Sequence, residues 1–134
     1  MKYHIIARKD LEMIVNTFYD NIRKNEQLGN IFDKIMQVDW EKHLPKMHDF
    51  WENILFQTGQ YKGRPFPPHV QVNEKIALTN EHFNTWLQLF GSTVDSLFTG
   101  SKANEIKLRA SSIKEIFNSK LNYINDYKGK VETL

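Results

Sequence analysis

The chain contains five histidines, and one of them has surroundings that suit a metal ligand. His69 follows Pro67 and Pro68, and two successive prolines restrict the backbone directly before the imidazole. No histidine forms the i, i+4 pair with an intervening glutamate that is typical of a helical zinc site. A haem iron, by contrast, binds one neutral imidazole nitrogen while the other ring nitrogen bonds to a nearby carbonyl. The pattern makes His69 a candidate haem-iron ligand, with a solvent-facing loop histidine as the alternative.

Aromatic side chains with polar atoms form a second group of candidates. Tyr19 ends an apolar helical stripe, so its ring should be buried and its hydroxyl needs a hydrogen-bond partner. Trp86 lies within another apolar face, and its indole N–H is costly to bury unpaired. A third face consists of His43, Met47, Phe50 and Trp51. Each group suits either a pocket for a flat ligand or a hydrophobic core, and spacing alone does not decide between them.

Composition argues against several classes of protein. The net charge is only +2 and no basic block is interleaved with aromatic residues, which argues against a nucleic-acid partner. The absence of cysteine excludes disulfides and thiolate metal sites and is compatible with the reducing cytoplasm. No apolar run approaches the roughly 20 residues that span a bilayer, and the N-terminus does not resemble a signal peptide. We therefore expect a cytoplasmic protein with no membrane segment.

Apolar periodicity predicts the helices that must position the candidate residues. The first helix has Asp10 as its predicted N-cap. Its buried face is predicted to consist of Leu11, Ile14, Val15, Phe18, Tyr19 and Ile22. Gly29 interrupts this pattern, and residues 31–36 then form a short helical element with Phe32 pointing inward.

The next predicted helix carries an apolar face over residues 44–55 and ends before the turn at residues 58–59. Asp39 is a candidate N-cap for this helix. Pro45 lacks a backbone donor and is comfortable only near a helix start, so we expect the turn around His43 to be irregular or to precede the regular helix.

The remaining chain is predicted to contain a loop and two further helices. Two glycines and three prolines between residues 58 and 73 favour an extended, ordered loop. A helix capped by Thr79 runs to Gly100, and the last helix begins near Ser101 and frays after Tyr127. Sustained period-two alternation is absent from the sequence. We therefore expect an all-α fold of four or five helices in one domain spanning residues 1–134.

The order and spacing of these elements resemble group III truncated haemoglobins over residues 8–122. The segments that carry the resemblance are Phe18-Tyr19, Leu28-Gly29-Asn30-Ile31-Phe32, His43, Phe50-Trp51, Tyr61-Lys62-Gly63-Arg64-Pro65, His69 and Trp86-Leu87-Gln88-Leu89-Phe90. The resemblance implies a shortened globin fold, in which two antiparallel helix pairs are stacked around one haem b.

The resemblance also implies roles for individual residues. His69 would be the proximal ligand of the haem iron, and Phe32 would pack against the porphyrin near its edge. Tyr19 and Trp86 would donate hydrogen bonds on the distal side, where a gas binds. His43 and Met47 would flank that gas. Pro45, two residues after His43, would either lift this histidine away from the iron or let it swing as a gate.

The resemblance places a further set of residues around the cofactor. These are Phe50, Trp51, Tyr61 and Phe66 as pocket lining, and Lys62 and Arg64 as partners of the haem propionates. The remaining histidines, His4, His48 and His82, are expected at the surface.

The implied function is reversible binding of oxygen, carbon monoxide and nitric oxide, with high oxygen affinity and a role in oxygen transport or in oxygen or nitric oxide chemistry. We expect a monomer that works with a ferric reductase. Two alternatives remain at this point. The first is a peroxidase-like haem enzyme that activates oxygen or peroxide. The second is a helical interaction module without haem, whose aromatic stripes are only core.

Overall fold

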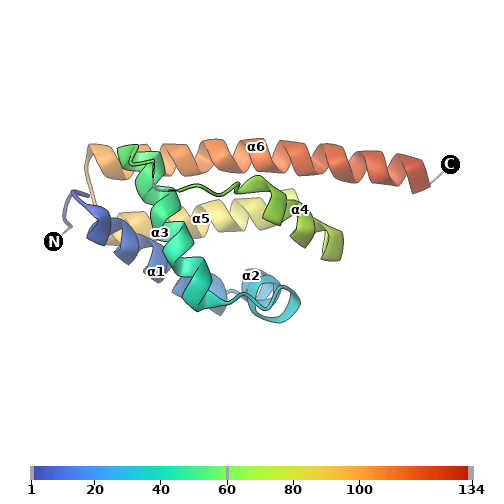
Figure 1. The fold of residues 1–134 in the computed structure, drawn as a ribbon, viewed down its shortest axis with the longest axis horizontal. Helices are drawn as coiled ribbons and strands as arrows, with labels where there is room; N and C mark the ends of the chain where they lie inside the picture. The colour runs from blue at the N-terminus through green and yellow to red at the C-terminus, as the bar shows by residue number, and fades with distance from the viewer. Residues whose placement is uncertain (1, 60, 133–134) are drawn as a thin grey trace.

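A computed structural model describes residues 2–59 and 61–132 of the chain, with side chains described up to Lys128. Six α-helices and one π-helix occur in this part of the chain (Figure 1). They are α1 (Arg8–Lys24), α2 (Glu26–Gly29), the π-helix η1 (Asn30–Ile35), α3 (Trp40–Phe56), α4 (Phe66–Lys75), α5 (Asn80–Leu97) and α6 (Ser101–Glu132). The described residues form no strand, and one isolated bridge joins Tyr3 to Phe98. The predicted all-α class is confirmed.

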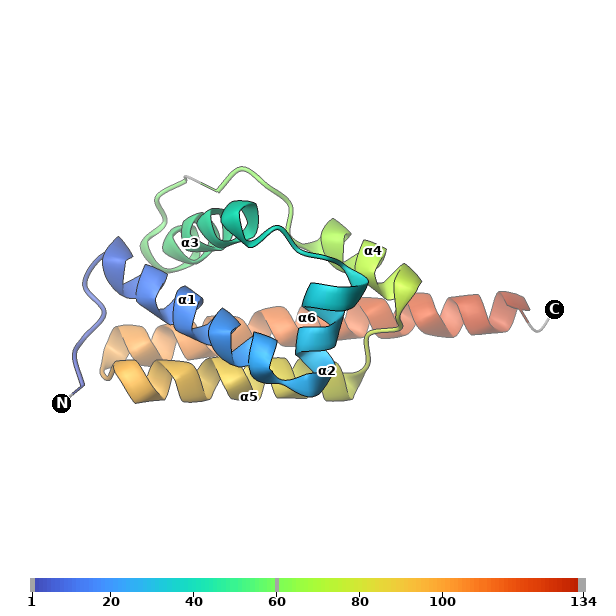
Figure 2. The same cartoon turned by 90° about the horizontal axis from the view of Figure 1, so that it is seen from below.

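Contacts among α1, α3, α5 and α6 organise the molecule. α5 runs antiparallel to α6, to which a short turn connects it, and α1 packs against both α3 and α5 (Figures 1 and 2). α4 lies beside the middle of α6, and the C-terminal end of α6 projects past all the other helices in both views. This arrangement leaves α4 resting mainly on α6.

The core is built from the apolar faces that periodicity predicts. The buried residues of α1 are the six predicted from the sequence. Phe18 and Phe90 are among the largest fully buried side chains and join α1 to α5 through an edge contact with ring centroids 5.1 Å apart. Burial of one such side chain contributes roughly 1.5–3 kcal/mol to stability. The core therefore holds α1 and α5 together beside the predicted site.

The N-terminus of α1 differs from the prediction. The helix begins at Arg8, so Asp10 lies in its first turn and is not the N-cap. The Asp10 carboxylate accepts hydrogen bonds from the backbone N–H groups of Ile6 at 2.8 Å and Ala7 at 3.1 Å. An acidic side chain at this position satisfies free donors and interacts favourably with the helix dipole, which is why Asp10 stabilises the start without occupying the cap.

α3 also begins earlier than predicted. It is a regular α-helix from Trp40 through Pro45, so His43 lies within the helix rather than in an irregular turn. Asp39 occupies the N-cap position, but its side chain makes no capping hydrogen bond. Gln57 has the left-handed φ of 55° and ends the helix before residues 58–59, as predicted. α3 packs against α1, and such tertiary packing supplies most of the stability of a helix in a folded protein.

The predicted extended loop over residues 58–73 is wrong in its second half. α4 starts at Phe66, with Pro65 as its N-cap and Pro67 and Pro68 in its first turn. The backbone N–H groups of a first turn have no partner within the helix, so proline loses no hydrogen bond there. The prolines therefore start the helix that carries His69, although their density favours a loop in a sequence-based prediction.

The last two helices agree with the prediction except at their ends. Thr79 is the N-cap of α5, and its hydroxyl accepts a hydrogen bond from the backbone N–H of His82 at 3.4 Å. His82 is buried in this cap rather than lying at the surface. α6 continues to Glu132, past Tyr127, after which we expected fraying. Within the described residues, no helix is both long enough and apolar enough to cross a bilayer.

Candidate functional site

Three predicted site residues meet where α1, η1 and α3 come together. Tyr19 of α1, Phe32 of η1 and His43 of α3 form a cluster of aromatic rings. The ring centroids of Tyr19 and His43 are 5.1 Å apart, and those of Tyr19 and Phe32 are 5.8 Å apart. The structure thus brings the predicted distal tyrosine, the predicted distal histidine and the inward-pointing Phe32 to one place.

His43 carries an unpaired buried nitrogen. Its Nε2 atom is buried and has no hydrogen-bond partner. Burial, together with the smaller effects of the nearby Lys46 and His69, lowers the pKa of His43 to about 4. The imidazole is therefore neutral at pH 7. An unpaired buried polar atom costs about 1–3 kcal/mol, so this nitrogen is a place where a bound polar molecule would find a partner.

His69 is held in one tautomer by the backbone of its own helix. Its Nδ1 atom lies 2.7 Å from the carbonyl oxygen of Pro65. A carbonyl oxygen can only accept a hydrogen bond, so Nδ1 carries the proton and Nε2 keeps a free lone pair. Burial lowers the pKa of His69, while the bond to Pro65 opposes that shift. The result is a neutral, oriented imidazole of the kind that ligates iron.

Phe18 lies between Trp86 and the cluster and contacts both Trp86 and Tyr19. The Trp86 indole contacts Phe18 edge-on at 5.8 Å and stacks on Phe90 at 5.7 Å, and Phe18 in turn contacts Tyr19 at 5.0 Å. Burial raises the pKa of Tyr19 well above its usual range, so its hydroxyl stays protonated. The hydrogen bonds between described residues include none donated by the Tyr19 hydroxyl or the Trp86 indole. Both groups therefore remain available as donors.

The other predicted lining residues divide between site and core. Met47 is partly buried against the core. Phe50 is buried and contacts Tyr61 at 5.2 Å. Trp51 is only 2% exposed and stacks on Phe90 at 4.7 Å, which is the position of a core residue. The structure therefore joins Tyr61, from the segment between α3 and α4, to the face of α3 that carries His43.

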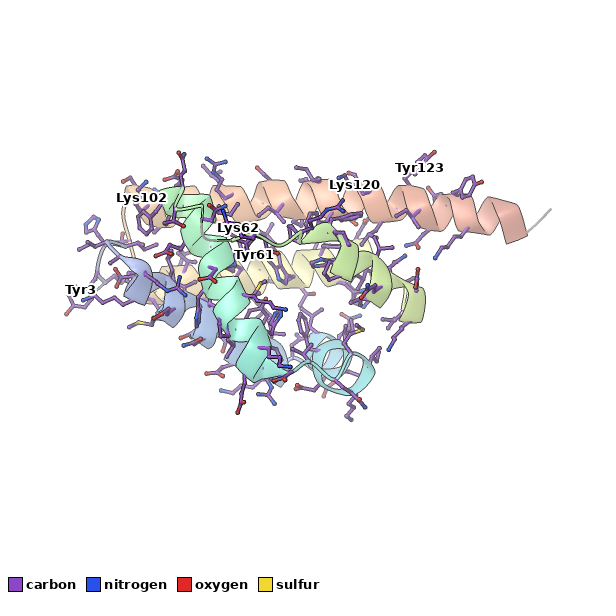
Figure 3. All side chains as sticks on the ribbon, in the orientation of Figure 1. Tyr3, Tyr61, Lys62, Lys102, Lys120 and Tyr123 are labelled. Carbon is purple, nitrogen blue, oxygen red and sulfur yellow. The ribbon has the colours of Figure 1, made fainter. Side chains whose placement is uncertain are left out.

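Lys62, Arg64 and Phe66 lie near the start of α4. Lys62 is exposed beside Tyr61 on the segment that leads to α4 (Figure 3). Neither Lys62 nor Arg64 forms an ion pair with an acidic side chain among the described residues. Phe66 contacts Phe117 of α6 at 5.2 Å, and the Lys120 ammonium lies 4.9 Å from the Phe66 ring centroid. The two free cations are therefore available to an anionic ligand.

The sequence and the fold of this chain are similar to those of known truncated haemoglobins. No family model matches the chain. Among curated proteins, a group 3 truncated haemoglobin of Campylobacter jejuni is 28% identical over 124 residues, which cover 90% of this chain and 95% of that protein. Among solved structures, the crystal structure of group III truncated haemoglobin from Campylobacter jejuni matches with a TM-score of 0.79 and 29% identity, covering 90% and 95% of the two chains. The predicted resemblance to group III truncated haemoglobins is confirmed. The truncated globin fold is confirmed with it.

Two residues of this truncated globin fold contact the site but were not predicted to do so. Trp40 of α3 contacts Tyr19, Phe32 and His43. Phe117 of α6 contacts His69, with the ring centroids 4.9 Å apart. Phe117 belongs to the apolar stripe of α6, and Trp40 precedes His43 by three residues and so shares its helix face. These two positions on helix faces are the features of the sequence from which the contacts of Trp40 and Phe117 could have been predicted.

Two hollows on the surface include neither Tyr19 nor His43 in their lining. One is an open, mostly apolar groove of about 390 Å³ beside Phe66 on α4 and Tyr123 on α6. The other, of about 460 Å³, lies beside Arg23 and Asp33. Neither brings together the polar groups that converge between α1, α3 and α4, so we place the candidate site at the histidines rather than at these hollows.

Proposed function

We propose that this chain is a haem protein that reversibly binds diatomic gases. The observation that carries the proposal is the pair of neutral histidines. The Nδ1 proton of His69 is bonded to the Pro65 carbonyl, and its Nε2 keeps a free lone pair. His43 has a buried, unpaired Nε2, and His69 lies near enough to lower the pKa of His43. One imidazole suits an iron ligand, and the other suits a contact to a small polar molecule.

The residues of the chain fit haem b as the cofactor. His69 would hold it through Nε2, apolar contact would come from Phe32, Phe50, Tyr61 and Phe66, and Lys62 and Arg64 would pair with its carboxylates. When bound, haem supplies an iron centre with an open position for oxygen, carbon monoxide or nitric oxide.

The distal side chains determine how tightly a gas is held. The Tyr19 hydroxyl stays protonated and can donate a hydrogen bond, and the Trp86 indole is always a donor. Fixed donors in a buried site need no reorganisation before they interact with developing negative charge. We therefore propose high oxygen affinity with slow oxygen release, with a task in oxygen or nitric oxide chemistry.

An absorption spectrum with added haem tests the proposal. The wild-type protein should bind one equivalent of haem and show a Soret band that shifts when the reduced form meets carbon monoxide. His69→Ala should disturb or abolish that spectrum. His48→Ala is the matched control, because His48 is hydrogen-bonded to Asn16 outside the cluster and should leave the spectrum unchanged. A wild-type protein that stays colourless would overturn the proposal and favour a helical module without haem.

A second candidate, a peroxidase-like activity, follows from the unpaired Nε2 of His43, which could accept a proton from a peroxide. A general base works best when its pKa is close to the working pH, and the pKa of His43 is about 4. We therefore expect weak turnover of a reductant with hydrogen peroxide. Rates that exceed those of free haem and fall in His43→Leu would favour this candidate.

We propose a single-domain monomer in the cytoplasm whose iron is returned to the ferrous state by a separate reductase, because reversible oxygen binding requires ferrous iron. Size-exclusion chromatography with light scattering tests the monomer, and a mass near twice 15.9 kDa would contradict it.

A further inference from the structure

Trp40, the first residue of α3, contacts all three members of the cluster. Its ring centroid lies 5.3 Å from that of Tyr19 and 5.6 Å from that of His43, to which it is nearly perpendicular. It stacks on Phe32 with an interplanar angle of 23° and a centroid distance of 5.8 Å. No other residue of the described chain is recorded in ring contact with the same three residues.

Two charged residues hold the Trp40 ring in place. The indole Nε1 donates a hydrogen bond to Asp33 Oδ1 at 2.9 Å, and Arg23 Nε donates to Asp33 Oδ2 at 3.1 Å. The Arg23 guanidinium also lies 5.0 Å from the Trp40 ring centroid, within the range of a cation–π interaction. Asp33 thus uses both carboxylate oxygens, and the three residues close a loop that joins α1, η1 and α3.

The charge state of Asp33 supports this loop. The hydrogen bond from Trp40 lowers the pKa of Asp33, and Arg23 acts in the same direction. The carboxylate is therefore ionised at neutral pH, and hydrogen bonds to an ionised acceptor are stronger than those between neutral groups.

His43 has no comparable restraint of its own. Its Nε2 is unpaired, and neither ring nitrogen forms a hydrogen bond with a described residue. The orientation of the imidazole therefore depends on the rings around it. Of these, Trp40 lies one helical turn earlier on the same face of α3 and is the one held by the hydrogen bond to Asp33.

We propose that Trp40, held by Asp33 and Arg23, is a positioning residue that keeps the His43 ring against Tyr19. The contact itself belongs to the protein, and only its consequence for a gas ligand rests on the proposed function. With Trp40 held, His43 stays beside Tyr19 inside the site. With Trp40 released, His43 gains a second orientation.

Substitutions at Asp33 test this while leaving all the aromatic rings unchanged. Asp33→Ala removes both acceptors, whereas Asp33→Asn keeps one oxygen for the Trp40 indole and so tests rescue by the conservative change. Asp95→Asn is the matched control, because Asp95 pairs with Lys107 at 2.6 Å between α5 and α6, away from the cluster. Exposed pairs contribute little to stability, so all three variants should fold.

The main readout is the nuclear Overhauser contact between the ring protons of His43 and Tyr19, recorded by NMR on the protein as it purifies. The second readout, for haem-loaded protein, is the C–O stretching band of the carbon monoxide complex. Asp33→Ala should lose the contact and show a second band. Asp33→Asn should keep the contact, and Asp95→Asn should match the wild type.

An unchanged Overhauser contact in Asp33→Ala would overturn the proposal, since Trp40 would then be only a structural residue. If Asp33→Ala does not fold, Trp40→Phe removes the indole donor while keeping a ring, and the same contact decides the question. A wild-type protein that binds no haem would overturn the proposed function, but the Overhauser comparison would still test the role of Trp40.

Discussion

Burial leaves Tyr19 with a protonated hydroxyl that has no partner among the described residues. Its ring is packed among Phe18, Phe32, Trp40 and His43, and its hydroxyl makes none of the hydrogen bonds found between described residues. Burial raises its pKa, so the hydroxyl keeps its proton and can act as a donor. A core tyrosine would normally satisfy this group within the protein.

Tyr19→Phe should therefore speed oxygen dissociation. Loss of one hydrogen bond to a strongly polarised ligand corresponds to roughly 1.4 kcal/mol, or about a tenfold faster rate. Stopped-flow displacement of oxygen by carbon monoxide measures this rate. Tyr123→Phe removes the hydroxyl of a tyrosine that is 74% exposed and should leave the rate unchanged. An equal rate in Tyr19→Phe and wild type would remove Tyr19 from the ligand site.

Prolines have opposite effects in two helices of this chain. In α4 they occupy the N-cap and first turn, where no hydrogen bond is lost. In α3, Pro45 is the sixth residue, so the carbonyl of Glu41 lacks the backbone donor it would otherwise have. The same residue type therefore begins one helix and weakens another.

Pro45→Ala should stabilise the protein, because alanine restores the missing donor within α3. The helix-propensity difference predicts a gain of up to about 3 kcal/mol. Pro68→Ala should instead lose about 0.4–1 kcal/mol, since proline there restricts the unfolded chain at no cost to the helix. Denaturant unfolding of both variants measures the expected gain and the expected loss in the free energy of unfolding. A loss of stability in Pro45→Ala would show that α3 depends on its proline.

The cap of α5 predicts a pH dependence. His82 Nδ1 accepts a hydrogen bond from the Thr79 backbone N–H at 3.0 Å, and burial lowers the pKa of His82 below its ordinary 6.5. The unfolded chain therefore binds a proton at higher pH than the folded one, so this part of the stability is present above pH 6.5 and is lost as the pH falls through the folded pKa. His82→Gln keeps an acceptor without titrating.

Thermal unfolding from pH 7 down to pH 5 should show a smaller loss of stability in His82→Gln than in wild type. His4→Gln is the matched control, because His4 is exposed and lies outside the cap of α5. Identical slopes for wild type and His82→Gln would mean that the cap does not require a neutral imidazole.

At the scale of the whole molecule, the C-terminal half of α6 supports the helix that carries His69. Asn73 of α4 and Asn125 of α6 exchange two side-chain hydrogen bonds, at 2.8 and 3.2 Å. Asn73 is buried and also accepts from the backbone N–H of Leu78 at 2.9 Å. Together with the contact of Phe117 and His69, this pair ties the candidate iron ligand to a helix that projects past the rest of the fold.

Asn125→Ala should destabilise the protein by about 1–3 kcal/mol, because it leaves the buried Asn73 amide short of a partner. In haem-loaded protein it should also speed haem transfer to an excess of a high-affinity acceptor globin, followed by absorbance. Asn122→Ala is the control, since its bond to Asn80 at 3.1 Å is exposed and should matter little. Equal haem-loss rates in the two variants would disprove a supporting role for Asn125.

Periodicity predicted the parts of this fold that depend on burying one face of a helix. The six buried residues of α1, the cap at Thr79 and the end of α3 could be read from the chain, because each is set by neighbours within a few residues. The prolines before His69 made it a candidate ligand, the resemblance assigned the roles of His69 and His43, and the structure places His43 in contact with Tyr19.

Tertiary structure decided the features that depend on contacts between distant segments. The prolines before His69 suit either a loop or a helix start. In the structure they start α4, whose His69 contacts Phe117 and whose Asn73 is hydrogen-bonded to Asn125. The same holds for Trp40, whose ring is held by Asp33 and by Arg23, 17 positions earlier in the chain. Local propensity is a weak preference that packing overrides, so such pairings could not be predicted from spacing.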